Sequence, residues 1–227
     1  MTTYNIAIDG PAGAGKSTIA KRAAKQLGFI YVDTGAMYRA IALYLLRKGI
    51  DRTDEKAIEA SCLDMDISLQ YENGEQKVLL NGEDVSGLIR TEEVSSMTSA
   101  ISVYVPVRQK LLELQRELAQ TKNVIMDGRD IGTCVLPNAQ TKIYLTASSH
   151  VRAVRRFKEL QEKGQMCNLE EIEQDIIERD HRDMNRDIAP LKQAEDAVFL
   201  DSSDMTIDQV VDAILMTAKE RGLEENR

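Results

Sequence analysis

The sequence predicts an α/β fold, in which a parallel β-sheet carries helices on both faces. Short apolar runs alternate with segments of helical periodicity along most of the 227 residues, an order typical of β-α-β units. The first apolar run leads through a glycine-rich turn directly into a helix. One segment, residues 64–86, departs from this order by alternating with period two, which indicates a small antiparallel sheet inserted into the α/β unit.

A phosphate-binding loop is predicted between the first strand, residues 4–9, and a helix over 16–27. Its spacing is G-x-x-x-x-G-K-S, whose glycines let successive N–H groups point inward at an anion. An accidental glycine–alanine turn is the alternative, and the strand and helix on its flanks argue against it. Lys16 is expected to reach the terminal phosphates of a nucleotide, and Ser17 to bind a magnesium ion between them. The residues expected to hold the nucleotide are Gly10, Pro11, Ala12, Gly13, Ala14, Gly15, Lys16, Ser17 and Thr18.

A second predicted strand, 29–32, is followed by a helix over about 35–48. One interpretation is that Asp33 or Thr34 only caps this helix and that Arg39 lies at the surface. However, the helix should begin beside the phosphate loop, because the carboxyl ends of parallel strands form one edge of the sheet. Thr34 is therefore expected to bond a base or a sugar, and Arg39 to bind a second phosphate.

The inserted sheet follows a helix expected over 53–61. Residues 64–86 contain Asn-Gly pairs at 73–74 and 81–82, which are strong signals for hairpin turns. Pro106 then begins a helix that runs to about residue 120. The apolar face of that helix consists of Leu111, Leu112, Leu114 and Leu118.

Two further apolar runs, 124–127 and 142–145, are predicted as buried parallel strands. Asp127 ends the first, where proteins with this type of loop carry the acidic residue that orients magnesium-bound water. Arg129 and Asp130 follow it between two glycines. A solvated turn with a mutual ion pair, worth under ~1 kcal/mol, is one interpretation. The ligand end of a strand favours a binding role instead.

A charged helical region covers about 149–187 and is broken near 163–164, before a closing strand over 197–200 and a helix over 206–220. The helical segments on the two sides of this break are expected to form a hairpin that folds over phosphates, because arginine binds phosphate oxygens bidentately. A charged face that is only solvated is the alternative. The two expected faces are Arg152, Arg155 and Arg156 before the break and Arg179, Asp183 and Arg186 after it.

Composition excludes several classes of protein. The net charge of -8 argues against a general nucleic-acid binder. No apolar run approaches the ~20 residues that cross a bilayer, and we expect a cytoplasmic protein without a membrane partner. Cys62, Cys134 and Cys167 are scattered and odd in number, which favours reduced thiols over a disulfide or zinc framework. His150 and His181 are expected at the surface, and the absence of an apolar stripe predicts a monomer.

Together these motifs resemble those of the bacterial cytidylate kinases, a family of phosphate-loop nucleoside monophosphate kinases. The resemblance implies one unit with a core of 1–34, 105–148 and 187–227, a monophosphate-binding lobe of 35–104 that carries the insert, and a helical lid of about 149–186. The matching segments occur in the expected order and are GPAGAGKST at 10–18, DTGAMYR at 33–39, NGEDVSGLIRTEEV at 81–94, DGRDIGT at 127–133 and RDHRDMNR at 179–186.

The resemblance also implies roles for single residues. Arg155 is expected to join the phosphate loop in binding ATP, and Asp127 to join Ser17 at the magnesium ion. Thr98 is an alternative to its neighbour Ser99 at the base. The residues implied in catalysis are Lys16, Arg129, Arg179 and Arg186. The residues implied in CMP binding are Thr34, Arg39, Ser99, Arg108, Arg129, Asp130, Arg179 and Asp183.

The expected reaction is ATP-dependent phosphorylation of CMP and dCMP. Cytosine offers a 4-amino donor where uracil offers a carbonyl acceptor, so a buried carboxylate such as Asp130 would accept from the first and repel the second. Another small-acceptor kinase, of the UMP/CMP or shikimate type, is disfavoured by the 64–86 insert and by DGRDIGT. A nucleotide-dependent switch is disfavoured further, because neither N-K-x-D nor an ABC-type signature occurs.

Overall fold

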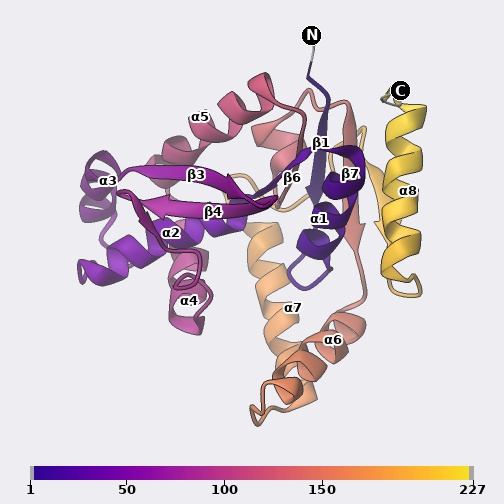
Figure 1. The fold of residues 1–227 in the computed structure, drawn as a ribbon. Coiled ribbons are helices and arrows are strands. Elements are labelled where there is room, and N and C mark those ends of the chain that lie inside the picture. The colour runs from indigo at the N-terminus through magenta and orange to yellow at the C-terminus, as the bar shows by residue number, and fades with distance from the viewer. Residues whose placement is uncertain (1–2, 225–227) are drawn as a thin grey trace.

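A five-stranded parallel sheet with strand order β2-β6-β1-β7-β8 forms the centre of the molecule, in a computed structural model that describes residues 3–224 (Figure 1). The central strand β1 pairs with β6 on one side and with β7 on the other, so the carboxyl end of β1 lies between the carboxyl ends of two neighbouring strands. Ligands of such sheets bind at the carboxyl ends of the strands. The strands are β1 (Asn5–Asp9), β2 (Ile30–Asp33), β6 (Val124–Gly128), β7 (Thr141–Thr146) and β8 (Val198–Asp201).

Helices cover both faces of this sheet, as predicted. Successive strand residues point to opposite faces, so Ile6 and Ile8 pack in one core with α1 and α8, and Ala7 packs in the other with α2 and α5. All three side chains are fully buried, which is typical of a parallel sheet covered on both sides. The covering helices are α1 (Lys16–Leu27), α8 (Ile207–Glu220), α2 (Thr34–Arg47) and α5 (Val105–Thr121).

The predicted antiparallel insert is confirmed as a separate three-stranded sheet that follows α3 (Glu55–Asp64). Its strands are β3 (Ile67–Glu72), β4 (Glu75–Leu80) and β5 (Glu83–Asp84). Both Asn-Gly pairs adopt positive φ angles, 53° and 80° at the first and 50° and 82° at the second. Tight hairpins require these angles, and asparagine and glycine tolerate them best. The insert lies against α2 in Figure 1, next to the edge strand β2.

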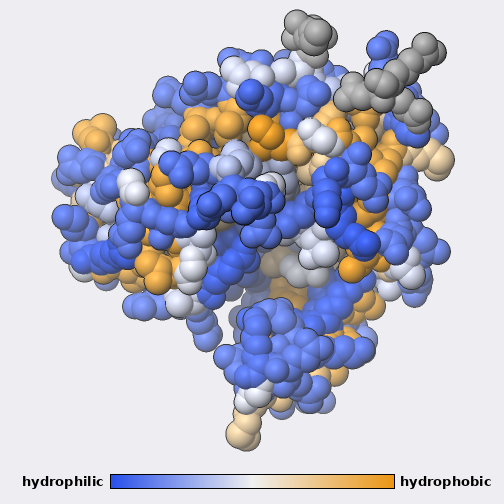
Figure 2. Space-filling view, viewed as in Figure 1, coloured by the Kyte–Doolittle hydropathy of each residue, from blue (hydrophilic) through white to orange (hydrophobic). Residues whose placement is uncertain are grey.

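A helical hairpin of α6 (Ser149–Glu162) and α7 (Leu169–Asn185) projects from the sheet, as expected (Figure 1). Ser148 caps α6 and Asn168 caps α7, each by accepting backbone N–H groups of the first turn. No residue of α7 is buried, and the surface over the projection is mostly hydrophilic in Figure 2. Few apolar contacts therefore restrain this hairpin.

Two elements were not expected from the sequence: α4 (Glu92–Ile101) and a π-helical turn, Ile131–Val135. Thr91 caps α4 by accepting the Val94 N–H, although the serine-rich sequence of this helix has only modest helix propensity. Between residues 3 and 224, no helix is long and apolar enough to cross a membrane. The three cysteines are free thiols, and both histidines are exposed, as expected.

Candidate active site

The phosphate loop lies between the end of β1 and the start of α1, as predicted. A Cβ atom on Gly10 would lie 1.9 Å from the carbonyl oxygen of Leu145 on β7, so only glycine lets the chain leave the sheet here. Lys16 is buried, and its Nζ donates to the carbonyl oxygen of Pro11 at 2.7 Å. The loop therefore curls around the ammonium group that is expected to meet the phosphates.

The two predicted magnesium ligands lie together at the end of β6. Ser17 Oγ donates to Asp127 Oδ2 at 3.0 Å, and Tyr31 Oη donates to Asp127 Oδ1 at 2.8 Å. Burial, and then the nearby charge of Asp33, raise the pKa of Asp127 to about 6. A hydroxyl and a carboxylate are the oxygen donors that Mg²⁺ prefers. Sequence reasoning missed Tyr31, whose signal was a polar tip at an otherwise apolar strand position.

Asp9, which sequence reasoning also missed, holds the loop that follows β6. Its Oδ1 accepts the Ile131 N–H and its Oδ2 accepts the Gly132 N–H, both at 2.7 Å. These bonds favour the carboxylate, but burial outweighs them and raises the pKa of Asp9 to about 6. Asp9 thereby fixes the backbone directly after Asp130. Its signal was an acidic residue at the carboxyl end of an apolar strand.

Asp130 lies at the centre of a buried ion-pair cluster, the base cluster, with Arg108 of α5 and Arg186. Arg108 Nη2 donates to Asp130 Oδ2, and Arg186 Nη2 lies 3.6 Å from Asp130 Oδ1. These side chains are at most 13% exposed. The mutual ion pair between Arg129 and Asp130 is not formed, because Arg129 pairs with Asp183 instead. The structure thus brings together two residues predicted for the base, Arg108 and Asp130.

The predicted position of Arg186 on one helical face with Arg179 and Asp183 is wrong. Helix α7 ends at Asn185, and Arg186 has an extended backbone with φ -69° and ψ 143°. The chain turns back toward the core here, and the Leu191 N–H donates to the Asp183 carbonyl oxygen at 2.8 Å. Arg186 consequently lies against Asp130 rather than on the face that carries Arg179.

Three cations lie close together near the phosphate loop: Lys16, Arg129 and Arg179. Arg129 Nε donates to Asp183 Oδ2 at 2.9 Å. Burial, and then the charge of Arg129, lower the pKa of Lys16 to about 7 and also lower the pKa of Arg179. The Nε of Arg179 is buried and has no hydrogen-bond partner within residues 3–224. Mutual repulsion of this kind favours a polyanion between these groups.

Arg39 lies beside Asp33 at the start of α2 and is not a free surface residue. Asp33 caps α2 by accepting the Ala36 N–H at 2.8 Å. The same carboxylate accepts from Arg39 Nη2 at 3.2 Å, and Arg90 Nη2 lies 3.6 Å away. The Nε of Arg39 is buried, and the described residues provide no acceptor for it. An orphaned guanidinium N–H in this position suits the oxygen of a phosphate.

The hydroxyls predicted to face the base all donate to backbone carbonyls. Thr34 Oγ1 donates to the carbonyl of Asp127 at 2.7 Å. Thr98 and Ser99 lie on α4 and donate to the carbonyls four residues earlier, at 2.7 and 3.2 Å. A hydroxyl that donates in this way retains its acceptor lone pairs. Each of the three can still accept from an amino group, and the choice between Thr98 and Ser99 stays a prediction.

The arginines expected on one face of α6 lie in different environments. Arg155 is exposed, and its Nη2 donates to the Ser202 carbonyl at 3.0 Å, after β8. Arg152 is only 4% exposed and donates to the carbonyl of Ala12 in the phosphate loop at 3.0 Å. It also donates to Asp180 of α7 at 2.6 Å. Arg152 therefore ties the helical hairpin to the phosphate loop, a role that its surface-like sequence context concealed.

Replacing Arg152 with methionine is expected to lower the free energy of unfolding by about 3–5 kcal/mol, because its partner Asp180, only 14% exposed, would lose its counter-charge. The matched control is Arg156→Met on the same helix, where a 49% exposed guanidinium pairs with Glu159. That change is expected to cost under ~1 kcal/mol. Urea unfolding measures both, and equal losses in the two variants would contradict the role of Arg152.

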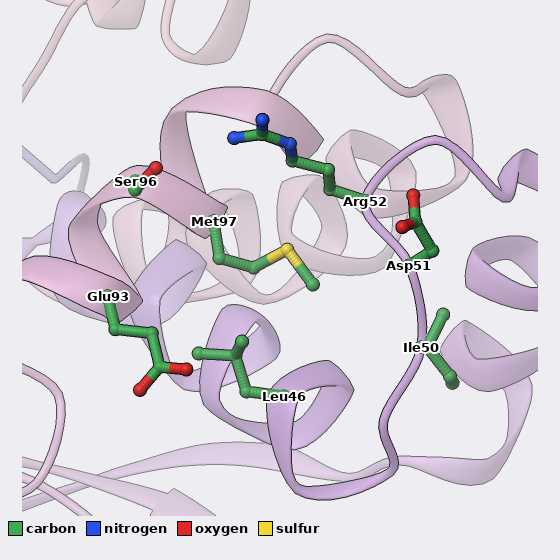
Figure 3. Close-up of a pocket in the computed structure, with 7 residues that line it drawn as sticks. All are labelled: Leu46, Ile50, Asp51, Arg52, Glu93, Ser96 and Met97. Carbon is green, nitrogen blue, oxygen red and sulfur yellow. The ribbon is translucent and has the colours of Figure 1, made fainter.

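A separate cavity of about 340 Å³ lies at the far end of α2, beside the loop that follows it and α4 (Figure 3). The residues predicted for the active site do not line it. Its lining residues are Leu46, Ile50, Asp51, Arg52, Glu93, Ser96 and Met97.

Comparison with known proteins identifies the family. Residues 6–220 match the family model for cytidylate kinase. The cytidylate kinase of Lactobacillus johnsonii is 53% identical over 206 residues, covering 91% of this chain and 90% of that protein. The cytidylate kinase of Caldicellulosiruptor bescii is 50% identical over 215 residues, 95% of each chain. A solved structure of an uncharacterized protein from Eubacterium ventriosum, 10% identical, has a TM-score of 0.52 over 96% of this chain and 99% of that one, a likeness of fold alone. The chain belongs to the cytidylate kinase family.

Proposed function

We propose that this protein transfers the terminal phosphoryl group of ATP to CMP and dCMP, forming ADP with CDP or dCDP. One observation carries the proposal: Arg129, the residue next to Asp130 in the chain, lies close enough to Lys16 of the phosphate loop for its charge to lower the pKa of Lys16, and Asp130 itself pairs with Arg108. The loop supplies a polyphosphate site, and the pair supplies a site for a polar base. Membership of the cytidylate kinase family supports this assignment of donor and acceptor.

Asp130 would read the base. Its carboxylate would accept from the 4-amino group of cytosine and would repel the carbonyl oxygen that uracil carries at the same position. Arg108 and Arg186 hold the carboxylate from two sides, so it is aimed before the substrate binds. Thr34 and Ser99, with Thr98 as the alternative, would add hydroxyl contacts to the nucleoside.

The acceptor phosphate would need positioning rather than activation. A phosphate monoester has a second pKa of about 6, so it is mostly dianionic at neutral pH and needs no general base. Arg39 and Arg129 would bind this group, and Asp183 would contact the ribose while it holds Arg129. Lys16 and Arg179 would offset the charge of the phosphoryl group in transit, which is the main demand of this chemistry.

Magnesium fits the Ser17 and Asp127 oxygens, which lie next to the phosphate loop. When bound there, the ion would neutralise charge on the ATP phosphates. Ser17 would provide a direct oxygen ligand, and Asp127 would orient the water molecules around the ion. Tyr31 holds the second Asp127 oxygen in place.

We also propose a division of the chain into moving parts. Residues 1–34, 105–148 and 187–227 would form the core, 35–104 the monophosphate-binding lobe, and about 149–186 the lid. The lid would carry Arg179 and Asp183 toward the substrates when it closes and would exclude water, which otherwise hydrolyses ATP. Arg155, at the base of the lid, would contact ATP from the side of Ser202.

A coupled assay of ADP release tests the proposal with CMP, dCMP, UMP, AMP and shikimate as acceptors. CMP and dCMP are expected to give the highest kcat/KM. Faster turnover with UMP or AMP than with CMP would overturn the proposed substrate. Nucleotide binding without acceptor-stimulated turnover would overturn the proposed reaction and point to a switch.

A further inference from the structure

The insert contacts the edge of the central sheet through the side chain of Gln76 on β4. The Asp33 N–H donates to Gln76 Oε1 at 2.9 Å, and Gln76 Nε2 donates to the Asp33 carbonyl at 3.3 Å. β2 is an edge strand, paired with β6 on one side only. The carboxamide therefore satisfies the same donor and acceptor that a further strand would satisfy at this edge.

Asp33, whose backbone Gln76 holds, is itself the anchor of Arg39, which is expected to bind the acceptor phosphate. Its carboxylate caps α2 and accepts from Arg39, with Arg90 3.6 Å away. Arg39 keeps a buried Nε that no described residue satisfies. A shift of the Asp33 backbone would move this carboxylate and the guanidinium that it orients.

We propose that Gln76 is a positioning residue for the acceptor phosphate, acting through Asp33 on Arg39. Gln76 does not itself touch the substrate. The inference rests on the proposed function, and it assigns to the insert a task at the active site: the insert sets the position of Arg39 as well as enlarging the lobe.

A positioning role differs from a merely structural one in what it predicts for different ligands. Gln76 acts on the phosphate end of the acceptor, whereas the base cluster of Arg108, Asp130 and Arg186 lies on other elements. Loss of the Gln76 contact should therefore weaken the binding of CMP and the binding of UMP by the same factor. Cytidine, which has the base but no phosphate, should bind as before. A general loosening of the lobe would instead weaken the binding of CMP, UMP and cytidine alike.

The test compares Gln76→Ala with the matched control Gln70→Ala, a glutamine on β3 of the same hairpin whose side chain is exposed. Gln76→Ala is expected to raise KM for CMP and for UMP about three- to tenfold, the range that loss of one or two hydrogen bonds produces. KM for ATP, kcat and the calorimetric affinity for cytidine should change less than about twofold, a factor too small to represent a lost hydrogen bond. Gln70→Ala should leave every constant unchanged.

Three outcomes would overturn the positioning role while CMP turnover by the unaltered protein persists: an unchanged KM for CMP, an equal rise in KM for ATP, or an equal loss of cytidine affinity. If Gln76→Ala does not fold, Gln76→Met replaces it, since this variant keeps the approximate size of the side chain and removes the carboxamide without adding a charge, and the same pattern is expected. Absence of CMP turnover in the unaltered protein would overturn the proposed function itself, a result distinct from all three.

Discussion

Replacing Lys16 with methionine is expected to lower kcat for CMP phosphorylation by about 10²–10³-fold, the loss typical when one preorganised donor to a developing charge is removed. Lys16 is 6% exposed and is the ammonium group around which the phosphate loop curls. Burial and the charge of Arg129 lower the pKa of Lys16 to about 7, which means that the folded protein destabilises the charged form of this side chain. A bound polyphosphate would stabilise that charged form. Steady-state kinetics with saturating CMP and ATP measures the effect.

The same substitution is expected to leave the midpoint of thermal unfolding unchanged or to raise it, because methionine fills a similar volume without a buried charge. Loss of activity with retained stability distinguishes a catalytic role from a structural one. Lys25→Met, at an exposed position near the end of α1, is the control and should alter neither quantity. A fall in kcat of less than tenfold in Lys16→Met would remove Lys16 from the transfer step.

The sequence predicted the fold well because its signals are local. Alternation of period two, Asn-Gly turns and capping residues depend on neighbours within a few positions. The strands of the parallel sheet lie within about one residue of their expected places, and the strands of the insert lie inside the predicted segment 64–86. α4 was missed although Thr91 caps it and Val94, Met97 and Ile101 form its buried face. Its serine-rich sequence competes with helix formation and obscured that pattern.

The candidate site was predictable where strand ends supplied the residues, and unpredictable where distant segments meet. Asp9 stands at the end of an apolar strand, but the backbone N–H groups that it accepts from lie more than 120 positions away, so its position alone does not reveal its partners. Gln76 contacts Asp33 across 43 positions, and the sequence around Gln76 is typical of a hairpin strand at the surface. Arg186 was misplaced because helical periodicity was extended one residue past the end of α7, where the tertiary contact of Leu191 takes over.

Replacing Asp130 with asparagine is expected to lower kcat/KM for CMP by about 10²-fold and to narrow the ratio of CMP to UMP use, because a site built for one hydrogen-bonding pattern discriminates through the partner left unpaired. Asparagine keeps the shape of the side chain but places an amide, with donor N–H groups, where the carboxylate accepts from Arg108 and faces Arg186. CMP would lose an acceptor for its 4-amino group, whereas UMP would lose a repulsion. The two substrates should therefore respond with different magnitudes.

The informative quantity is the ratio of CMP to UMP turnover. Loss of the ion pairs with Arg108 and Arg186 should also reduce stability, which lowers the turnover of CMP and UMP together. A reduced fraction of folded enzyme scales CMP and UMP turnover equally and leaves the ratio untouched, so a narrowed ratio reports base recognition alone. Asp212→Asn, an exposed position on α8, should change neither rate nor ratio. An unchanged ratio in Asp130→Asn, whatever the absolute rates, would show that the carboxylate supports the fold of the site and does not read the base.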